Sequence, residues 1–458
     1  MEFDQALEQT QTLALTRQGY ALSAVDKLIL QGTWSGLTYD EMANTSDYSL
    51  NYLMRDVAPR LWKLLSKVYG ERVSKSNYRA VCDRYSDPDA ETPPSAPVPS
   101  PASRPSPARP LEQPDWGDAP DVPDSGFFGR EAELAELTGW LKGTDGDRCR
   151  LVTLWGLPGI GKTSLARRLA DQVKGEEKDE FEFVVWRSLR HKPLLQDLAQ
   201  DVLPRLGVEW VPGQEIAQFI EVFQQSRCLI VLDGLESLLR NNDPWRRYEP
   251  DYDNYGTLFQ RLAEIPHQSC LLLTCQEKPR ELNLLEYPSQ PVQLKELKGL
   301  APKTATVFAE AYGLKDPETW QDLFERYAGH PIVLKQIATL SRDIFGGQVK
   351  ELLEMSMLLP EGNFQVVWKR LTPDEQRFLT QISTEKSESL GVITAVSAFN
   401  ETKSEDATLT TEAVQVIESL KARSLIEITT EPTERNTVKT RLNLSGLIKK
   451  FITLNAKP

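Results

Sequence analysis

The segment that most restricts the fold is residues 156–163, which read GLPGIGKT. It follows an apolar run, residues 151–155, and leads into a helical pattern, residues 164–173. Glycines in such a loop let backbone N–H groups turn inward and cradle phosphates at the start of a helix. The pattern G-x4-G-K-[ST] between a strand and a helix therefore predicts a phosphate-binding P-loop in a parallel α/β domain.

The residues of this loop have expected roles in binding a purine nucleoside triphosphate. The Lys162 ammonium would reach the β- and γ-phosphates, and the Thr163 hydroxyl would be a ligand of Mg²⁺. The other positions expected to contact the nucleotide here are Gly156, Gly159, Ile160, Gly161 and Ser164. A structural glycine-rich turn is the alternative, and the flanking strand and helix disfavour it.

A second motif, CLIVLDGLE at residues 228–236, supplies acidic residues for the same site. A buried strand that ends in a carboxylate would place Asp233 beside the Mg²⁺ coordination shell, as a second metal ligand. Glu236, three residues later, is positioned to polarise an attacking water. Asp233 and Glu236 are therefore the candidate catalytic residues. The alternative for Glu236 is an ordinary acidic residue in a loop.

Short apolar runs alternate with helical patterns around these motifs, which is typical of a parallel α/β sheet. Besides the run before the P-loop, they cover residues 183–186, 228–232, 271–274 and 292–294. Residues 302–359 then have a helical pattern throughout. Helices are predicted at residues 373–381 and 412–421, followed by strand-like runs at 425–429 and 439–444. The order of these last elements resembles a winged helix.

A proline-rich linker separates this body from an N-terminal head. Between Pro88 and Pro123 lie 12 of the chain's 30 prolines. Such a segment buries too little apolar surface to offset its ordering entropy, so residues 87–125 are predicted to be disordered. In the head, residues 1–86, helix caps at Ser23, Thr38 and Ser49 outline a helix-turn-helix.

The head also carries a local basic region. From Arg55 to Arg84, eight lysines and arginines stand against three acidic residues, a net charge of +5, with aromatic residues between them. This composition suits a surface that faces nucleic-acid phosphates. The alternative is a protein-interaction domain whose basic residues form a solvated helix face, and this is the preferred interpretation.

The overall composition excludes several classes of protein. A net charge of −13 argues against nonspecific polyanion binding by the whole molecule. The five cysteines form no CxxC pair and the three histidines form no ligand cluster, so we expect neither a disulfide framework nor zinc. The sequence shows neither a signal peptide nor a run approaching 18 apolar residues. The expected location is therefore the cytoplasm, away from membranes.

In order along the chain, FFGRExE, GLPGIGKT, VVWRSL, LIVLDGLE, LLLTCQEKP and YAGHPIVLK resemble the NB-ARC (AP-ATPase) branch of the STAND NTPases. These are signalling ATPases of apoptosome scaffolds, plant immune receptors and bacterial regulators. The resemblance implies a P-loop α/β domain at residues 126–298, a helical domain at 299–361 and a winged helix at 362–458. In this family the three close over bound ADP and open with ATP.

The resemblance also assigns residues by position. Phe128, Gly129 and Arg130 would lie at the adenine end of the site, and Pro331 would pack on the nucleotide from the helical domain. The neighbouring His330 is expected to cap or pack rather than act as a base.

Two positions depart from the family pattern. Gln276 replaces an arginine that senses the γ-phosphate, and a glutamine lacks the charge that would compensate the triphosphate. Ser445 replaces a histidine that contacts the ADP β-phosphate.

The head resembles the helix-turn-helix module that precedes such ATPase cores in bacteria (vMAP-type N-terminal domains). Together these resemblances imply a signalling switch driven by ATP and ADP, with at most slow ATPase activity. The head would be the adaptor or output domain that contacts protein partners, and nucleotide-dependent homo-oligomers are expected to be accessible. The alternative is a nucleotide-regulated transcription regulator whose head binds DNA. No repeat sensor domain is expected within the chain.

Overall fold

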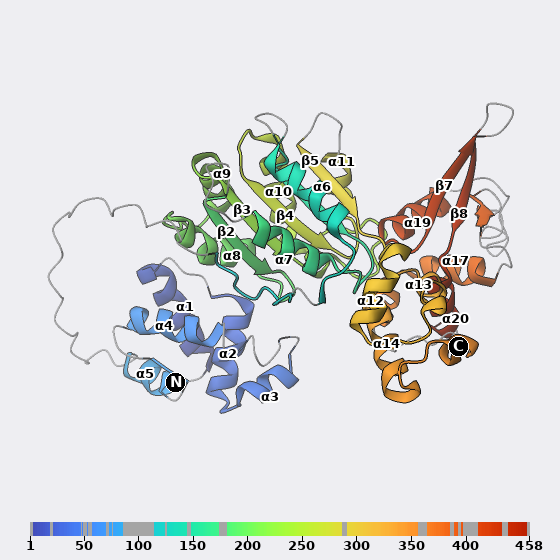
Figure 1. Ribbon diagram of the computed structural model, residues 1–458. Coiled ribbons are helices and arrows are strands. Elements are labelled where there is room, and N and C mark those ends of the chain that lie inside the picture. Colours follow the sequence, from blue (N-terminus) through green and yellow to red (C-terminus); the bar gives the residue numbers. More distant parts are fainter. Residues whose placement is uncertain are drawn as a thin grey trace. The chain divides into compact units, whose positions relative to one another are not determined.

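The computed structural model (Figure 1) describes residues 3–18, 22–46, 48, 53, 57–69, 73–75, 77–85, 114–123, 126–143, 148–173, 181–285, 291–355, 364–384, 389–392, 395–396, 411–432 and 438–455. The chain divides into two compact units. The first comprises residues 1–107 and 211–214, and the second comprises residues 108–210 and 215–458.

A five-stranded parallel sheet in the order β2-β3-β4-β1-β5 forms the centre of the second unit. Its strands are β1 (Leu151–Trp155), β2 (Phe183–Ser188), β3 (Cys228–Asp233), β4 (Cys270–Cys275) and β5 (Val292–Glu296). Each predicted apolar run forms one of these strands. Every residue of β1, β3 and β4 is buried, which explains why their sequences are continuously apolar rather than alternating. The prediction of a parallel α/β domain is confirmed.

Helices cover both faces of this sheet (Figure 1). Successive strand residues point to opposite faces: in β3, Leu229 and Val231 join one core cluster and Ile230 and Leu232 join the other. The first cluster contains α6 (Glu131–Lys142) and α7 (Lys162–Gln172). The second contains α8 (Leu195–Val202), α9 (Glu215–Gln225), α10 (Asp253–Glu264) and α11 (Arg280–Leu285).

Part of the predicted linker is ordered, so the expectation of disorder up to residue 125 is wrong for residues 114–123. Asp115 adds to the edge of β2, where its N–H donates to Val184 O (2.9 Å) and its carbonyl accepts from Trp186 N (2.9 Å). Its carboxylate pairs with Arg187 at 2.6 Å, and Arg167 lies over the ring of Trp116. The pairing uses backbone groups, which leave no apolar pattern in the sequence. Residues 87–113 lie outside the described ranges.

The rest of the second unit is mainly helical and contains a small antiparallel sheet of order β6-β8-β7. Its elements are α12 (Ala305–Ala311), α13 (Trp320–Arg326), α14 (Pro331–Phe345), α15 (Lys350–Glu354), α16 (Gln365–Arg370), α17 (Pro373–Thr384), β6 (Ser389–Gly391), α19 (Thr411–Ala422), β7 (Glu427–Pro432), β8 (Val438–Asn443) and α20 (Gly446–Asn455). One hydrophobic cluster runs from Leu300 to Ile452. The helical and winged-helix assignments of this region stay predictions.

The first unit contains five described helices: α1 (Phe3–Gln18), α2 (Ala24–Trp34), α3 (Tyr39–Asn44), α4 (Ala58–Tyr69) and α5 (Tyr78–Tyr85). The caps predicted at Ser23 and Thr38 are present, each as a capping box. The third predicted cap, Ser49, lies outside the described residues. Helix α1 was not predicted, because its apolar residues do not gather on one face. No described helix has the length and apolar character needed to cross a bilayer.

A buried hydroxyl joins α1 to α4 and α5. Thr10 donates to the Ala6 carbonyl at 2.6 Å, so its oxygen is the acceptor for the hydroxyls of Tyr69 (2.7 Å) and Tyr78 (2.9 Å). All three of these side chains are buried. The Thr10 oxygen therefore satisfies two buried phenol groups at once.

We predict that Thr10→Val destabilises the first unit by about 1–3 kcal/mol, because two buried donors lose their acceptor. Hydrogen exchange of α1, α4 and α5 amides, measured in the intact chain by mass spectrometry, reports this loss. Thr12→Val is the matched control, since Thr12 makes the same bond within the helix, to Glu8 O (2.8 Å), on the exposed face. Equal exchange in the two variants would contradict the prediction.

Candidate nucleotide-binding site

A cavity of about 450 Å³ lies at the carboxyl ends of β1, β3 and β4, within the range of small-molecule sites. The predicted site residues that line it are Phe128, Arg130, Gly159, Ile160, Gly161, Lys162, Thr163, Ser164, Asp233, Glu236 and Pro331. Gly129 and Gly156 are not among its lining residues. The structure thus brings together residues as far apart in the sequence as Phe128 and Pro331.

The P-loop backbone needs its glycines. Gly156, Gly159 and Gly161 have φ angles of +145°, +76° and +102°, in the region that side chains rarely adopt. A Cβ atom on Gly156 would also lie 2.7 Å from the Leu297 carbonyl oxygen, and one on Gly159 would lie 2.4 Å from Ile332. Gly156 therefore shapes the loop from outside the cavity instead of lining it.

Lys162 places a buried positive charge at the centre of this loop. Its ammonium donates to the carbonyl oxygens of Gly156 (2.8 Å) and Leu157 (2.9 Å). Burial lowers the pKa of Lys162, and the nearby carboxylate of Glu236 opposes this shift. A phosphate in the cavity would supply the anion that a desolvated ammonium favours.

Asp233 connects three structural elements through short hydrogen bonds. Its Oδ1 accepts from the hydroxyls of Thr163 (2.7 Å) and Thr274 (2.6 Å), and its Oδ2 lies 3.2 Å from the Arg190 guanidinium. Thr274 pairs in register with Asp233 on one side and Leu154 on the other, so the sheet itself aligns these groups.

The residues around Asp233 fit magnesium better than zinc. Thr163 and Asp233 offer hydroxyl and carboxylate oxygens, the hard donors that Mg²⁺ prefers. Among the described residues there is no group of three His, Cys, Asp or Glu side chains that could hold a metal ion alone. Mg²⁺ binds with few protein ligands and completes its shell with phosphate oxygens and water. Thr163 and Asp233 are therefore suited to holding Mg²⁺ together with a nucleotide.

Glu236 and Gln276 lie next to each other at the same cavity. The Glu236 Oε2 atom accepts a hydrogen bond from the backbone N–H of Gln276 at 3.0 Å. Burial raises the pKa of Glu236, and Lys162 opposes this shift. Glu236 is thus a half-buried residue whose carboxyl group is held by a backbone amide at the cavity, where it is a candidate proton acceptor.

The three residues assigned to the adenine end have different structural roles. The Arg130 guanidinium donates to the carbonyl oxygens of Ile160 (3.0 Å) and Lys298 (2.6 Å), so it braces the P-loop. Gly129 has a φ of +62°, and a Cβ atom there would clash with Thr304. Only Phe128 offers an apolar surface, beside Phe308 and Tyr312. For Arg130 and Gly129 the structure favours support of the site over contact with a base.

His330 is buried and packs against Phe364, with ring centroids 5.5 Å apart. It is the N-cap residue of α14 and its side chain makes no capping hydrogen bond. Burial lowers the pKa of His330 to about 4. Of the two roles expected for it, the structure therefore supports packing rather than capping.

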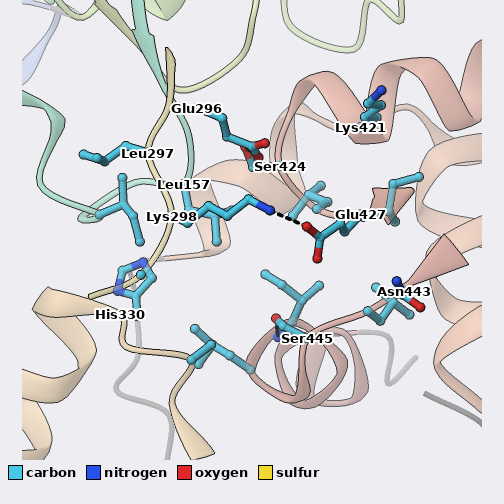
Figure 2. A pocket seen from close by; sticks show the side chains of 18 of the residues that line it. Leu157, Glu296, Leu297, Lys298, His330, Lys421, Ser424, Glu427, Asn443 and Ser445 are labelled. Atoms are coloured by element: carbon cyan, nitrogen blue, oxygen red, sulfur yellow. Dashed lines mark hydrogen bonds and ion pairs between the residues drawn. The ribbon is translucent and has the colours of Figure 1, made fainter. Parts of the chain in front are cut away.

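Ser445 does not line the cavity described above. It lines a second one of about 710 Å³, which the Lys298–Glu427 ion pair crosses (Figure 2). Its hydroxyl accepts from Ile448 N at 3.2 Å and so caps α20. Ser445, which stands where the family has a histidine that contacts the ADP β-phosphate, thus lines a different cavity from the P-loop residues. The resemblance gave its position in the sequence but not which cavity it would line.

Several polar residues that line the first cavity were not predicted from the sequence, among them Asp121, Arg190, Thr274 and Lys335. Thr274 carried a signal, because it is the one hydroxyl in the apolar run LLLTC. Arg190 follows β2, and its proximity to Asp233 depends on β2 pairing with β3. Sequence spacing alone does not reveal that pairing.

Comparisons with known proteins agree with this geometry. Residues 1–85 match the family of vWA-MoxR associated protein N-terminal HTH domains, and residues 150–315 match the NACHT domain. A WD repeat-containing protein of Nostoc sp. is 37% identical over 267 residues, which cover 55% of this chain and 20% of that protein. The disease resistance-like protein DSC1 of Arabidopsis thaliana is 25% identical over 222 residues, covering 47% of this chain and 17% of DSC1. The chain thus spans about a fifth of these relatives' lengths.

Among solved structures, the Aeropyrum pernix ORC2 protein in its ADPNP-ADP complexes is similar over 74% of this chain and 97% of its own. The sequence identity is 14% and the TM-score is 0.45. A score at this level does not establish a common overall arrangement.

We predict that His330 contributes to acid sensitivity. The unfolded chain binds a proton at this histidine below pH 6.5, whereas the folded chain does so only near pH 4. The unfolded state therefore holds more protons between these values, and stability falls as the pH is lowered, by up to about 3 kcal/mol. Urea unfolding at pH 7 and pH 4.5 should show a smaller loss in His330→Gln than in wild type. An NMR titration that gives His330 a pKa near 6.5 would contradict this account.

Proposed function

Because this chain is a STAND-type NTPase with an N-terminal helix-turn-helix domain, we propose that it is a signalling switch whose P-loop cavity binds ATP and ADP with Mg²⁺. The geometry of the buried Lys162 carries the proposal. Its ammonium lies in a loop whose glycines have positive φ angles, at the start of helix α7. The first backbone N–H groups of α7 are available there to bind an anion. Phosphates bound there would meet a full charge and a helix dipole in a poorly solvated site.

We assign separate roles in nucleotide binding and hydrolysis to the residues that line the cavity. Lys162 and the loop N–H groups would hold the β- and γ-phosphates, while Phe128 and Pro331 line the apolar part. Mg²⁺, held by Thr163 and Asp233, would neutralise phosphate charge when bound. Glu236 would accept a proton from an attacking water, since it lines the cavity and its raised pKa favours holding a proton. We propose slow hydrolysis that resets the switch from ATP to ADP.

We propose that the head is the adaptor or output domain that contacts protein partners. Two of the eight basic residues that suggested a phosphate-facing surface lie over rings of the same domain. The Lys75 ammonium is 4.4 Å from the Tyr39 ring centroid, and the Arg79 guanidinium is 5.0 Å from that of Trp34. These contacts support a structural role for part of the basic region, and so favour protein partners over DNA.

Lys162→Ala should abolish tight binding of both ATP and ADP, because the phosphates lose a desolvated positive charge. Isothermal titration calorimetry with each nucleotide measures the change. Lys192→Ala is the control, because Lys192 is an exposed lysine that pairs with Glu249 on the surface. Unchanged affinities in a folded Lys162→Ala protein would refute the assignment of the site.

Wild-type turnover should be slow, and Gln276→Arg should raise it. A positive charge at this end of the cavity would stabilise the developing phosphoryl charge; we expect about tenfold, below the roughly 10³-fold of arginines that act directly. Single-turnover hydrolysis measures both rates. Gln276→Met, similar in length and uncharged, should give no increase. A wild-type rate above about one per second, the normal range for enzymes, would show that the missing arginine does not limit this site.

A further inference from the structure

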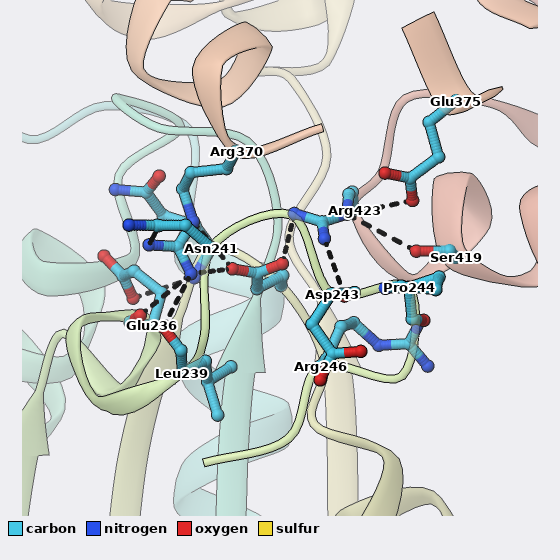
Figure 3. Close-up of polar contacts among 12 residues, drawn as sticks. Glu236, Leu239, Asn241, Asp243, Pro244, Arg246, Arg370, Glu375, Ser419 and Arg423 are labelled. Carbon is cyan, nitrogen blue, oxygen red and sulfur yellow. Dashed lines mark hydrogen bonds and ion pairs between the residues drawn. The ribbon is translucent and has the colours of Figure 1, made fainter. Parts of the chain in front are cut away.

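The last residue of helix α16, Arg370, binds the loop that carries Glu236. Its Nη2 donates to the carbonyl oxygen of Glu236 at 3.0 Å and to that of Leu239 at 3.5 Å. In return, the Arg370 carbonyl accepts from the backbone N–H of Asn242 at 3.1 Å. Figure 3 shows Arg370 reaching from its own helix to this loop. Arg370 thus both donates hydrogen bonds to this loop and accepts one from it, and so fixes the backbone of residues 236–242 to the end of α16.

The same arginine also holds the neighbouring strand end. Its Nε donates to Glu277 Oε1 at 2.8 Å. Glu277 directly follows Gln276, whose backbone N–H donates to the Glu236 carboxylate at 3.0 Å. Arg370, Glu236 and the pair Gln276–Glu277 thus form a closed ring of contacts. Two members of that ring, Glu236 and Gln276, line the nucleotide cavity.

A second arginine, at the end of another helix, also binds a member of this ring. Arg423, just after α19, forms an ion pair with the other oxygen of Glu277 and lies 3.5 Å from Glu375 Oε1 (Figure 3). It also donates to the Asp243 carbonyl at 3.3 Å. Arg423, Glu277 and Glu375 are each at most 3% exposed. Charges buried to this degree need a defined geometry, because an unpaired partner would be strongly disfavoured.

We propose that Arg370 is a positioning residue of the nucleotide site: it sets the place of the Glu236 carboxylate while α16 is docked on the α/β domain. The planar guanidinium binds a carboxylate and two loop carbonyls at once, which a point charge does not do. Among the described residues, the printed bonds of Arg370 reach the cavity through the Glu236 loop and the end of β4, so we expect its effect on the Glu236 carboxylate and not on phosphate binding. This inference rests on the proposed function, because it concerns hydrolysis at that site.

The test compares Arg370→Lys with wild type in the full-length protein, using ATP and Mg²⁺. Lysine keeps a positive charge beside Glu277 but loses the fork that reaches the loop carbonyls. We expect single-turnover hydrolysis at saturating ATP to fall about tenfold. The dissociation constants for ATP and ADP should stay within about threefold of wild type, because the P-loop is untouched. A role confined to folding would instead lower nucleotide affinity and melting temperature together.

Asn241→Ala is the matched control. Asn241 is exposed and accepts only the Arg370 Nη1 hydrogen bond (2.8 Å), so its loss should leave the rate within about twofold of wild type. If Arg370→Lys does not fold, Arg370→Gln keeps one donor for the Glu236 carbonyl and should show the same separation of rate from affinity.

Three results would overturn the inference: a wild-type rate in Arg370→Lys, a loss of rate matched by an equal loss of ATP affinity, or a wild-type protein that binds ATP without hydrolysing it. In each of these results the wild-type protein still binds nucleotide, so the proposed binding of ATP and ADP is not affected. A wild-type protein that binds neither ATP nor ADP would instead refute the proposed function itself.

Discussion

The geometry of the nucleotide site depends on one carboxylate oxygen that accepts hydrogen bonds from two hydroxyl groups. Asp233 Oδ1 binds Thr163 at the start of α7 and Thr274 in β4, and Asp233 itself ends β3. These bonds fix the P-loop helix against the two strands; Asp233 and Thr274 are buried, and Thr163 is half-buried at the cavity. The parallel register of β3 and β4 sets Asp233 beside Thr274, so the site is a consequence of the sheet.

Several charged side chains near this site are buried. The arginines among them bind groups of the α/β domain and of the helices that follow it. Buried ion pairs add little net stability compared with apolar packing, because desolvation offsets their attraction. Their value here is geometric: Arg130 braces the P-loop from one side, and Arg370 braces the Glu236 loop from the other. A site held on both sides by guanidinium groups is sensitive to any movement of the elements that supply them. That sensitivity is what a nucleotide-dependent switch requires.

The sequence predicted the five strands and the P-loop because both leave local patterns: continuous apolar runs for buried parallel strands, and glycine spacing for the loop. Features that depend on tertiary contacts were missed. Asp115 joins the sheet through backbone groups, and Arg190 reaches Asp233 only because β2 lies beside β3. Arg130 was predicted at the adenine end of the site and lines the cavity, but its bonds to the carbonyl oxygens of Ile160 and Lys298 were not predicted, since a motif gives the position of a residue and not which atoms it binds.

The central claim is that this cavity binds an adenine nucleotide through its P-loop. The most direct test is to purify this chain, denature it by heating, and identify the released nucleotide by chromatography. The amount of nucleotide is then compared with the amount of protein. The account predicts ADP or ATP at up to one nucleotide per chain, or, if the purified protein is empty, saturable binding of added ATP and ADP at one site. A protein that releases no nucleotide and binds neither ATP nor ADP when Mg²⁺ is present would contradict it.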